Sequence, residues 1–192
     1  MHIESFEIMR YFVDTYLDKN KKLDILEVGS YDVNGSYSSL FQNPNWNTCG
    51  LDIEAGPNVD VVSKSLYDFG LNKQYDVVVT GNCLEHVEAP WKLIQEIHKV
   101  TKKGGFVCII TPLTIPEHRY PLDCWRILPD GYRYMLEKES DFTILETKIN
   151  KSKPRYKLKH TKRTSRFALK FIRKYYFENI NIDDTYVVAI KN

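Results

Sequence analysis

Two acidic residues and two glycines early in the chain have the spacing of a cofactor-binding turn. Glu27, Gly29 and Gly35 lie in residues 24–36 (DILEVGSYDVNGS), where a short apolar run leads directly into a turn. Glycine permits backbone angles and close approaches that a β-carbon forbids. A carboxylate such as Glu27 is costly to bury in an apolar strand unless another group hydrogen-bonds it. The stretch therefore predicts a ligand cradle, and Asp52, which ends the next apolar run, is a second acidic candidate.

A histidine follows the apolar strand predicted at residues 75–80. Residues 81–86 (GNCLEH) leave the end of this strand and place an imidazole there, a group that commonly acts as a general base in proteins. His86 is therefore a candidate base or acceptor contact. The alternative is that it caps the next helix or packs beneath the loop.

Residues 118–126 (HRYPLDCWR) combine a titratable ring, a carboxylate, aromatic rings and guanidinium groups, which suits the binding of a polar acceptor. Tyr120 and Trp125 offer flat faces for a sugar or ring. Asp123 can accept hydroxyl protons, and Arg126 can pair with a carboxylate or phosphate. The alternative is an internal Asp123–Arg126 pair that only fastens the loop, with Trp125 in the core. We take His86, His118 and Asp123 as the catalytic candidates.

Alternating strands and helices must position these residues. The expected strands are 24–28, 47–53, 59–62, 75–80, 106–110, 142–149 and 185–190, and the expected helices are 5–17 with Ser5 as its cap, 36–41, 89–100 and one that begins at Pro129. This order predicts an α/β fold with a parallel sheet and helices on both faces, whose ligands bind at the carboxyl ends of the strands. Residues 29–35, Asp52, the segment near Tyr67 and residues 82–86 should therefore surround one crevice.

The pattern E-x-G at Glu27 and Gly29, the acidic Asp52, residues 84–87 (LEHV) and Thr111-Pro112 after residues 103–105 (KGG) together resemble class I S-adenosylmethionine-dependent methyltransferases. Within that group the chain is similar to a methyltransferase type 11-like branch. This branch carries E-x-G-S-x-D-x-N-G-S, then G-x-D-I-x-x-G-P-x-V-D-V-V, then H-x-Y-P-x-D-x-W-R. The resemblance covers about residues 25–131.

The resemblance implies a Rossmann-like, doubly wound, mostly parallel seven-stranded sheet with an antiparallel last strand. It also implies S-adenosylmethionine as cofactor, with Glu27 orienting the turn or its waters and Asp52 accepting the ribose hydroxyls. In NAD-binding proteins an acidic residue about 20 positions after the glycine turn also binds the ribose hydroxyls, so Asp52 alone does not distinguish S-adenosylmethionine from NAD. The turn lacks G-x-G-x-x-G, which disfavours a dehydrogenase. The implied cofactor contacts are Glu27, Gly29, Ser30, Tyr31, Gly35, Asp52, Ile53, Leu66, Tyr67, Asn82, Cys83 and Leu84.

Some of these assignments have a plain structural alternative. Leu66 and Tyr67 could flank adenine, although Tyr67 could equally serve in packing. Gly29 and Gly35 could form an ordinary loop between a strand and a helix, and Asp52 could merely shape a turn with Gly56-Pro57.

Methyl transfer from a sulfonium is an in-line displacement, so the protein must position the acceptor and remove a proton when the acceptor is a hydroxyl. By resemblance, members of this branch often belong to glycan and cell-surface biosynthesis, which makes a sugar hydroxyl the first expectation. Tyr120, Trp125 and Arg126 are the expected acceptor contacts.

The 192 residues, 43% of them hydrophobic, fit a single domain over 1–192, with residues 148–178 as a basic insertion before the last strand. No apolar stretch approaches the roughly 18 residues of a membrane span, and the N-terminus has no signal-like core, so we expect a cytoplasmic protein. The four cysteines include no C-x-x-C pair, and no metal site is predicted. The sequence predicts no particular oligomeric state.

Charge is concentrated in one segment. Residues 148–174 hold twelve Lys and Arg without any Asp or Glu, which leaves fifteen basic residues against 25 acidic ones elsewhere. Aromatic residues within 163–177 have helical spacing among the basic ones, as in a basic amphipathic helix. Such a helix could lie on an anionic membrane surface, bind RNA phosphates, or dock on the sheet with its charges in water. No RNA-recognition motif accompanies it, so a nucleic-acid partner is the minor option.

Three hypotheses for the function follow. The first is a methyltransferase that acts on oxygen of a glycan or other small polar acceptor. The second is an RNA methyltransferase that uses the basic segment. The third is a cofactor-binding module that has lost catalysis and serves as a partner subunit.

Overall fold

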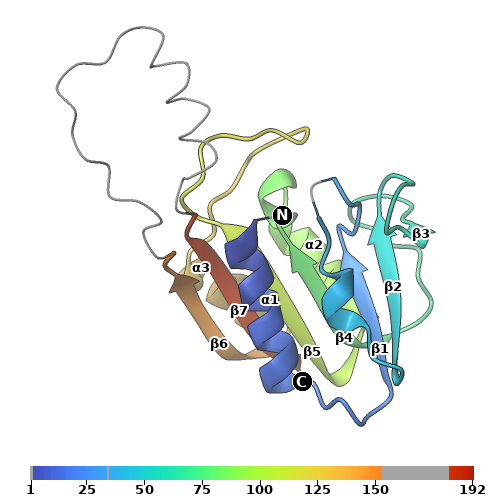
Figure 1. Ribbon diagram of the computed structural model, residues 1–192. Coiled ribbons are helices and arrows are strands. Elements are labelled where there is room, and N and C mark those ends of the chain that lie inside the picture. Colours follow the sequence, from blue (N-terminus) through green and yellow to red (C-terminus); the bar gives the residue numbers. More distant parts are fainter. Residues whose placement is uncertain (1, 34, 153–181) are drawn as a thin grey trace, which may run out of the picture.

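A seven-stranded sheet forms the centre of the computed structural model, which describes residues 2–33, 35–152 and 182–192 (Figure 1). The described strands are β1 (Leu23–Val28), β2 (Trp46–Asp52), β3 (Val61–Val62), β4 (Tyr75–Gly81), β5 (Thr101–Pro112), β6 (Phe142–Asn150) and β7 (Asp184–Lys191). They are ordered β3-β2-β1-β4-β5-β7-β6, and β7 runs antiparallel to both of its neighbours. The predicted fold class is confirmed.

Both faces of the sheet are apolar, as expected of strands covered on two sides. Along β4, Val77 and Val79 face one hydrophobic cluster and Val78 faces the other. The first cluster contains α1 (Ile3–Tyr16) and η1 (Ser38–Phe41); the second contains α2 (Pro90–Val100), α3 (Pro129–Arg133) and the π-helical turn η3 (Tyr134–Lys138). The helices therefore cover both faces, and Figure 1 shows α1 and α2 on opposite sides.

Two predicted boundaries were wrong. The first helix begins at Ile3, so Ser5 is not its cap; Ser5 is buried in the first turn, and its hydroxyl donates to the carbonyl of His2 at 2.9 Å. Strand β5 begins at Thr101 instead of residue 106. Thr101 already pairs with Tyr75 before a register shift, because the glycine-containing stretch after it bulges without leaving the ladder.

The carboxyl ends of β1, β2, β4 and β5 share one edge of the sheet, since these strands are parallel. Asp184 at the start of β7 pairs with Pro112 at the end of β5, so β7 begins at the same edge. The loop 113–128 leaves from here and extends above the strand ends in Figure 1. We call this side of the molecule the carboxyl edge.

Most of the basic segment predicted at 148–178, with its amphipathic helix at 163–177, lies outside the described residues. In the described ranges, no helix is long and apolar enough to cross a bilayer.

Candidate active site

The turn after β1 needs both of its predicted glycines. Gly29 has φ 74° and Gly35 has φ 109°, in the left-handed region that side chains rarely adopt. A β-carbon on Gly29 would also lie 2.9 Å from Cys83 Sγ, so the turns after β1 and β4 are in direct contact. Two adjacent amides of this turn, those of Gly29 and Ser30, donate to the carbonyl of Leu51 at 2.9 and 3.1 Å. The turn is thus fastened across the carboxyl edge.

Asp52 at the end of β2 holds this turn in place. Its Oδ2 accepts from the amide of Tyr31 at 2.9 Å, and its Oδ1 accepts from the amide of Ile53 at 2.7 Å. Oδ1 also accepts from the amide of Glu54 at 3.5 Å, so the free lone pair is on Oδ2. Asp52 can therefore shape the turn and still accept a hydrogen bond from a ligand, while the side chain of Ile53 is exposed beside it.

Glu27 lies near the end of β1 beneath the turn. Asn58 Nδ2 donates to Glu27 Oε2 at 3.2 Å and to the carbonyl of Ser30 at 3.0 Å. Burial raises the pKa of Glu27 to about 7, although the hydrogen bonds from Asn58 and the backbone of Tyr37 oppose the shift. A cation bound nearby would favour the ionised form of this carboxyl.

The turn after β4 presents unpartnered polar atoms. Asn82 has φ 55°, its amide donates to the carbonyl of Ile110 at 2.9 Å, and its Nδ2 donates to Ser5 Oγ at 3.3 Å. Its Oδ1 and the hydroxyl of Ser30 are buried without a hydrogen-bond partner in the part of the chain described. Burial raises the pKa of Cys83 to about 12, which keeps the thiol neutral, and Leu84 is fully buried.

Leu66 and Tyr67 are half-buried and pack against the cluster that contains α2. The hydroxyl of Tyr67 accepts a hydrogen bond from the amide of Ala89 at 3.0 Å, just before α2. Tyr67 therefore has a packing role, and its predicted contact with adenine stays a prediction.

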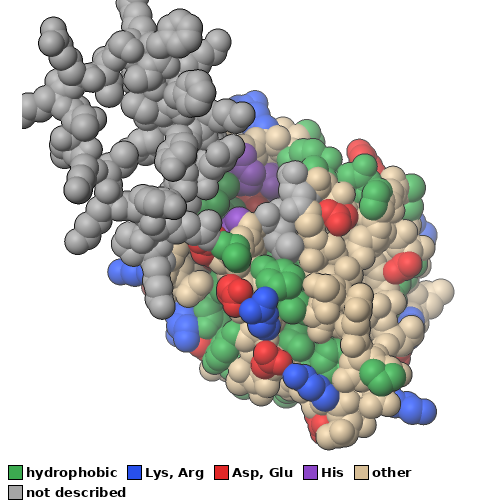
Figure 2. Space-filling view, in the orientation of Figure 1, with side chains coloured by type: hydrophobic (Ala, Val, Ile, Leu, Met, Phe, Trp, Pro, Cys, Tyr) green, Lys and Arg blue, Asp and Glu red, His purple; other side chains and the backbone are tan. Residues whose placement is uncertain are grey.

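Two histidines and a glutamate meet where η2 (Leu84–His86) contacts the loop 113–128. The rings of His86 and His118 have centroids 4.9 Å apart and are nearly perpendicular. Glu85 Oε1 lies 3.6 Å from His86 Nε2 and 3.9 Å from His118 Nε2. Figure 2 shows histidine side chains at the surface of this part of the molecule. We call these three residues the Glu–His–His cluster.

The neighbours of the two rings fix how they can react. His86 Nδ1 lies 2.6 Å from the carbonyl oxygen of Leu122, which can only accept, so Nδ1 carries the proton and Nε2 the lone pair in the neutral ring. His118 Nδ1 lies 3.5 Å from Asp123 Oδ2. Burial lowers the pKa of His118, although the charge of Asp123 raises it. In both rings Nε2 is the nitrogen that faces Glu85.

Glu85 is the residue that the sequence analysis missed. It is fully buried, and neither carboxylate oxygen has a hydrogen-bond partner among the described residues. Burial raises its pKa to about 8. A sequence signal did exist, since an acidic residue stood directly beside the candidate His86, but only the structure shows that it is buried.

The loop 113–128 is tied to η2 by its backbone. The amides of Cys124 and Trp125 donate to the carbonyl of Glu85 at 2.7 and 3.3 Å, and the indole of Trp125 donates to the carbonyl of Val87 at 2.9 Å. These bonds bring His118 against η2. The loop and the turn after β4 are therefore in direct contact.

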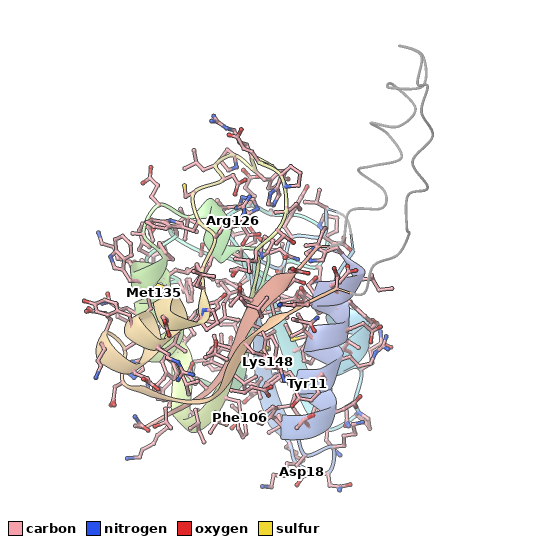
Figure 3. The ribbon with its side chains drawn as sticks, turned by 90° about the vertical axis from the view of Figure 1, so that its left-hand side faces the viewer. Tyr11, Asp18, Phe106, Arg126, Met135 and Lys148 are labelled. Atoms are coloured by element: carbon pink, nitrogen blue, oxygen red, sulfur yellow. The ribbon has the colours of Figure 1, made fainter. Side chains whose placement is uncertain are left out.

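The acceptor candidates have mixed surroundings. Arg126 donates from Nη2 to Asp123 Oδ2 at 2.8 Å, in the internal pair that the sequence analysis gave as the alternative, and Figure 3 shows Arg126 near this edge. Trp125 is not in the core: it is 37% exposed and meets Trp91 edge to face at 6.0 Å. Tyr120 is 57% exposed. Trp125 and Tyr120 can still face an acceptor, and their roles stay predictions.

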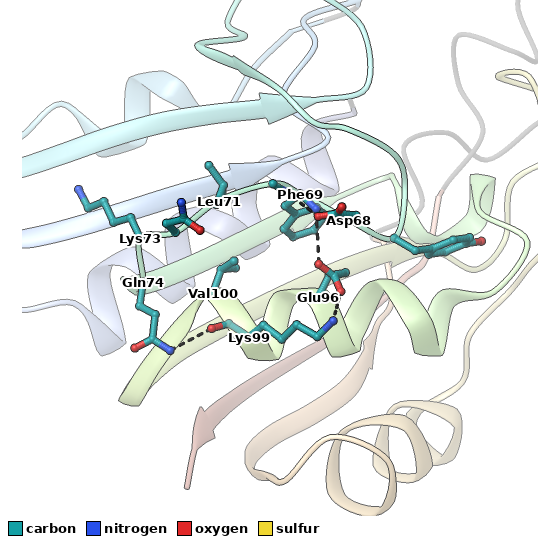
Figure 4. Close-up of a pocket in the computed structure, with 11 residues that line it drawn as sticks. Asp68, Phe69, Leu71, Lys73, Gln74, Glu96, Lys99 and Val100 are labelled. Atoms are coloured by element: carbon teal, nitrogen blue, oxygen red, sulfur yellow. Dashed lines mark hydrogen bonds and ion pairs between the residues drawn. The ribbon is translucent and has the colours of Figure 1, made fainter.

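A pocket of about 430 Å³ lies away from this edge, between residues 67–74 and the C-terminal half of α2 (Figure 4). Its Glu96 and Lys99 already pair with each other, and Glu96 also accepts from the amide of Phe69 at 3.4 Å. Of the predicted site residues it contains Tyr67 alone. We therefore place the candidate site at the strand ends, where the unpartnered polar atoms gather.

The family of the chain follows from a match to known proteins. Residues 2–140 match a family model described as a methyltransferase domain. The chain belongs to this methyltransferase family. A search of curated proteins found no match.

Solved structures share the fold at low sequence identity. A SAM-dependent methyltransferase from Archaeoglobus fulgidus is 17% identical with a TM-score of 0.61, over 97% of this chain and 95% of that one. Magnesium protoporphyrin IX methyltransferase from Synechocystis, with bound SAM, is 14% identical with a TM-score of 0.60, over 98% and 79%. Phosphoethanolamine N-methyltransferase 2 from Haemonchus contortus, in complex with S-adenosyl-L-methionine, is 13% identical with a TM-score of 0.61, over 98% and 52%. Their acceptors differ, so the fold alone names none for this chain.

Proposed function

We propose that this chain is an S-adenosylmethionine-dependent methyltransferase that acts on an oxygen atom of a sugar, a glycan or another small polar acceptor. One observation carries the proposal: the ring of His86, which follows β4, meets the ring of His118, which comes from the loop after β5, and the turn after β4 contacts the glycine turn after β1. A donor turn and proton-accepting nitrogens thus share one edge of the sheet.

The residues of the carboxyl edge fit the cofactor. The absence of a side chain at Gly29 lets Cys83 pack against the turn, Asp52 has a free lone pair on Oδ2 for a ribose hydroxyl, and Glu27 offers a carboxylate to a cation. The unpartnered Ser30 Oγ and Asn82 Oδ1 add polar atoms that a ligand could satisfy. When bound, S-adenosylmethionine supplies a methyl group on a positively charged sulfur.

The chain's own residues would prepare the acceptor. As the acceptor oxygen bonds to the methyl carbon, the electron pair of the broken carbon–sulfur bond stays on sulfur, and the hydroxyl proton must leave the oxygen. An imidazole Nε2 of His86 or His118 can take this proton, and Asp123 Oδ2, which accepts from the backbone amide of His118 at 2.8 Å, lies 3.5 Å from Nδ1 of that ring. Tyr120 and Trp125 present exposed rings to a sugar nearby.

Calorimetry with S-adenosylmethionine and S-adenosylhomocysteine tests the donor half. We expect binding of both, and about tenfold or greater loss of affinity in Asp52→Ala, because the variant loses a ligand contact and the bond that fastens the turn at Tyr31. Glu54→Ala is the matched control, since Glu54 is an exposed acidic residue in the same connection. A folded protein that binds neither compound would refute the proposal.

Turnover on a panel of sugars and glycans tests the acceptor half. His118→Ala should lower turnover by about 10²–10⁴-fold while cofactor affinity stays unchanged, as expected of a base that does not touch the donor. Loss of cofactor binding in this variant, or turnover equal to that of the unmodified chain, would contradict the assignment.

A further inference from the structure

The Glu–His–His cluster has the composition and spacing of a metal site. One ligand atom from each of its three residues lies within 4.8 Å of the others. Two ligands at zinc distances of 2.0–2.2 Å in a tetrahedral site lie about 3.4 Å apart. The observed separations of 3.6 and 3.9 Å between Glu85 Oε1 and the two Nε2 atoms need only small adjustments to reach this value.

The carboxylate of Glu85 lacks what a buried carboxylate needs. Its side chain is fully buried, and neither oxygen finds a hydrogen-bond donor in residues 2–33, 35–152 and 182–192. Desolvating such a group without a partner is costly, and buried charges in proteins are paired or coordinate metals. Oε1 lies 3.6 and 3.9 Å from the two Nε2 atoms, beyond hydrogen-bond distance, so neither imidazole satisfies it directly.

The outer contact of His86 is that of a metal ligand. A ligating histidine donates its second ring N–H to a carbonyl or a carboxylate, which fixes the tautomer. His86 Nδ1 has the carbonyl of Leu122 at 2.6 Å, so this ring presents the lone pair of Nε2 inward. His118 Nδ1 makes no hydrogen bond among the described residues, and Asp123 Oδ2 lies 3.5 Å from it.

The nearest guanidinium does not occupy the cluster. Arg126 is engaged by both oxygens of Asp123 and by the carbonyls of Trp125 and Ile115. When both imidazole rings are neutral, the net charge of the three candidate ligands is the negative charge of the Glu85 carboxylate.

We propose that Glu85, His86 and His118 bind a divalent transition-metal ion of the zinc type. Two nitrogens and one carboxylate suit zinc better than magnesium, which prefers oxygen ligands. Three protein ligands leave a fourth position open, and in the proposed function, on which this step rests, an acceptor hydroxyl would occupy it. With the ion bound, the two imidazoles would serve as ligands and would no longer act as the base. The ion would instead lower the pKa of the acceptor hydroxyl, so its proton could leave to water.

Calorimetric titration of the chelator-stripped full chain with zinc sulfate tests the site. We expect one ion bound per chain, no binding of magnesium chloride, and at least about a tenfold loss of zinc affinity in Glu85→Gln and in His118→Ala. Glu88→Gln is the matched control, because Glu88 is exposed three residues away. His118→Ala provides a second test if Glu85→Gln fails to fold, since the side chain of His118 is 35% exposed.

Cys124 is an exposed thiol in the same loop and could capture zinc by itself. The proposal assigns zinc to the Glu–His–His cluster and not to this thiol, so Cys124→Ser should bind zinc as the unmodified chain does. The proposal is overturned by absence of zinc binding, by zinc binding that is unchanged in both cluster variants, or by zinc binding that is lost in Cys124→Ser. Cofactor calorimetry on the same samples separates the two proposals, since a metal-free protein that binds S-adenosylmethionine retains the proposed function.

Discussion

Two glutamates in this chain have opposite surroundings. Glu146 on β6 accepts from the hydroxyls of Tyr11 at 3.0 Å, Tyr16 at 3.1 Å and Tyr186 at 2.7 Å, and pairs with Lys148. Figure 3 shows Tyr11 and Lys148 close together, away from Arg126. Glu85 is more deeply buried and has no hydrogen-bond partner for its oxygens among the described residues.

The pKa values of the two carboxyls diverge accordingly. Burial alone would raise the pKa of Glu146, but the bonds from Lys148 and the tyrosines outweigh it and lower the pKa to about 2. Burial of Glu85 raises its pKa to about 8. Glu146 joins α1 to the sheet edge and is a structural group. The Glu85 carboxylate makes no hydrogen bond to another described residue, which is the pattern expected where function outweighs stability.

Removal of Glu146 should have the largest effect on stability. Glu146→Leu leaves three tyrosine hydroxyls and an ammonium without their acceptor. Because water can solvate the exposed Tyr11 and Lys148, we expect the free energy of unfolding to fall by about 1–3 kcal/mol. Urea denaturation in the presence of a chelator measures it. A loss below about 0.5 kcal/mol, the range of ordinary surface changes, would show that the network is not structural.

Removal of Glu85 should change the free energy of unfolding in the opposite direction. Glu85→Leu replaces an unpartnered buried carboxyl with an apolar side chain, so the metal-free protein should gain about 1–2 kcal/mol in free energy of unfolding. The same denaturation experiment applies, with Glu146→Leu as the contrasting variant. A loss of similar size in both variants would remove the distinction between the two carboxylates.

Glu27 lies between these extremes, with hydrogen bonds from Asn58 and the backbone of Tyr37 and a pKa raised to about 7. A cationic cofactor should prefer its ionised form, so affinity for S-adenosylmethionine should rise about tenfold from pH 6 to pH 8. Calorimetry across this range measures it. Glutamine does not ionise, so in Glu27→Gln the part of the rise in affinity that depends on Glu27 should disappear. If the affinity of the variant rises equally with pH, another titrating group causes the effect.

The same shift predicts the pH dependence of the cofactor-free protein. The folded state holds the Glu27 proton to a higher pH than the unfolded chain does, where the pKa is 4.5. The contribution of Glu27 to stability is therefore present below pH 4.5 and is lost as pH rises to about 7. The urea midpoint of the unmodified chain should fall relative to that of Glu27→Gln across this window, and parallel curves would contradict the shift.

Local patterns were enough to predict the sheet and the cradle. Apolar runs of strand length, the glycines at 29 and 35, and Asp52 at a strand end are encoded within short windows of sequence, so the edge they share could be inferred. The Glu–His–His cluster could not be predicted from short windows of sequence. Glu85 and His118 are 33 positions apart, and they meet because backbone amides of the loop 113–128 dock on the carbonyl of Glu85, which no side-chain pattern records.

The sequence also could not show which groups the side chains bond to. The Asp123–Arg126 pair was one of two alternatives, and only the folded loop shows that Trp125 remains at the surface while the pair forms. The misplaced cap at Ser5 has the same origin, because the hydroxyl bonds back to a carbonyl and not to the amides of the first turn.

Anomalous diffraction at the zinc absorption edge, from crystals grown with zinc and S-adenosylhomocysteine, tests the central claim most directly. We predict one anomalous peak at about 2.0–2.2 Å from a carboxylate oxygen of Glu85 and from Nε2 of His86 and His118. The S-adenosylhomocysteine should lie against the Gly29 turn with its ribose at Asp52. A well-ordered cluster without a peak, in crystals that contain the cofactor product, would contradict the assignment of Glu85 as a ligand.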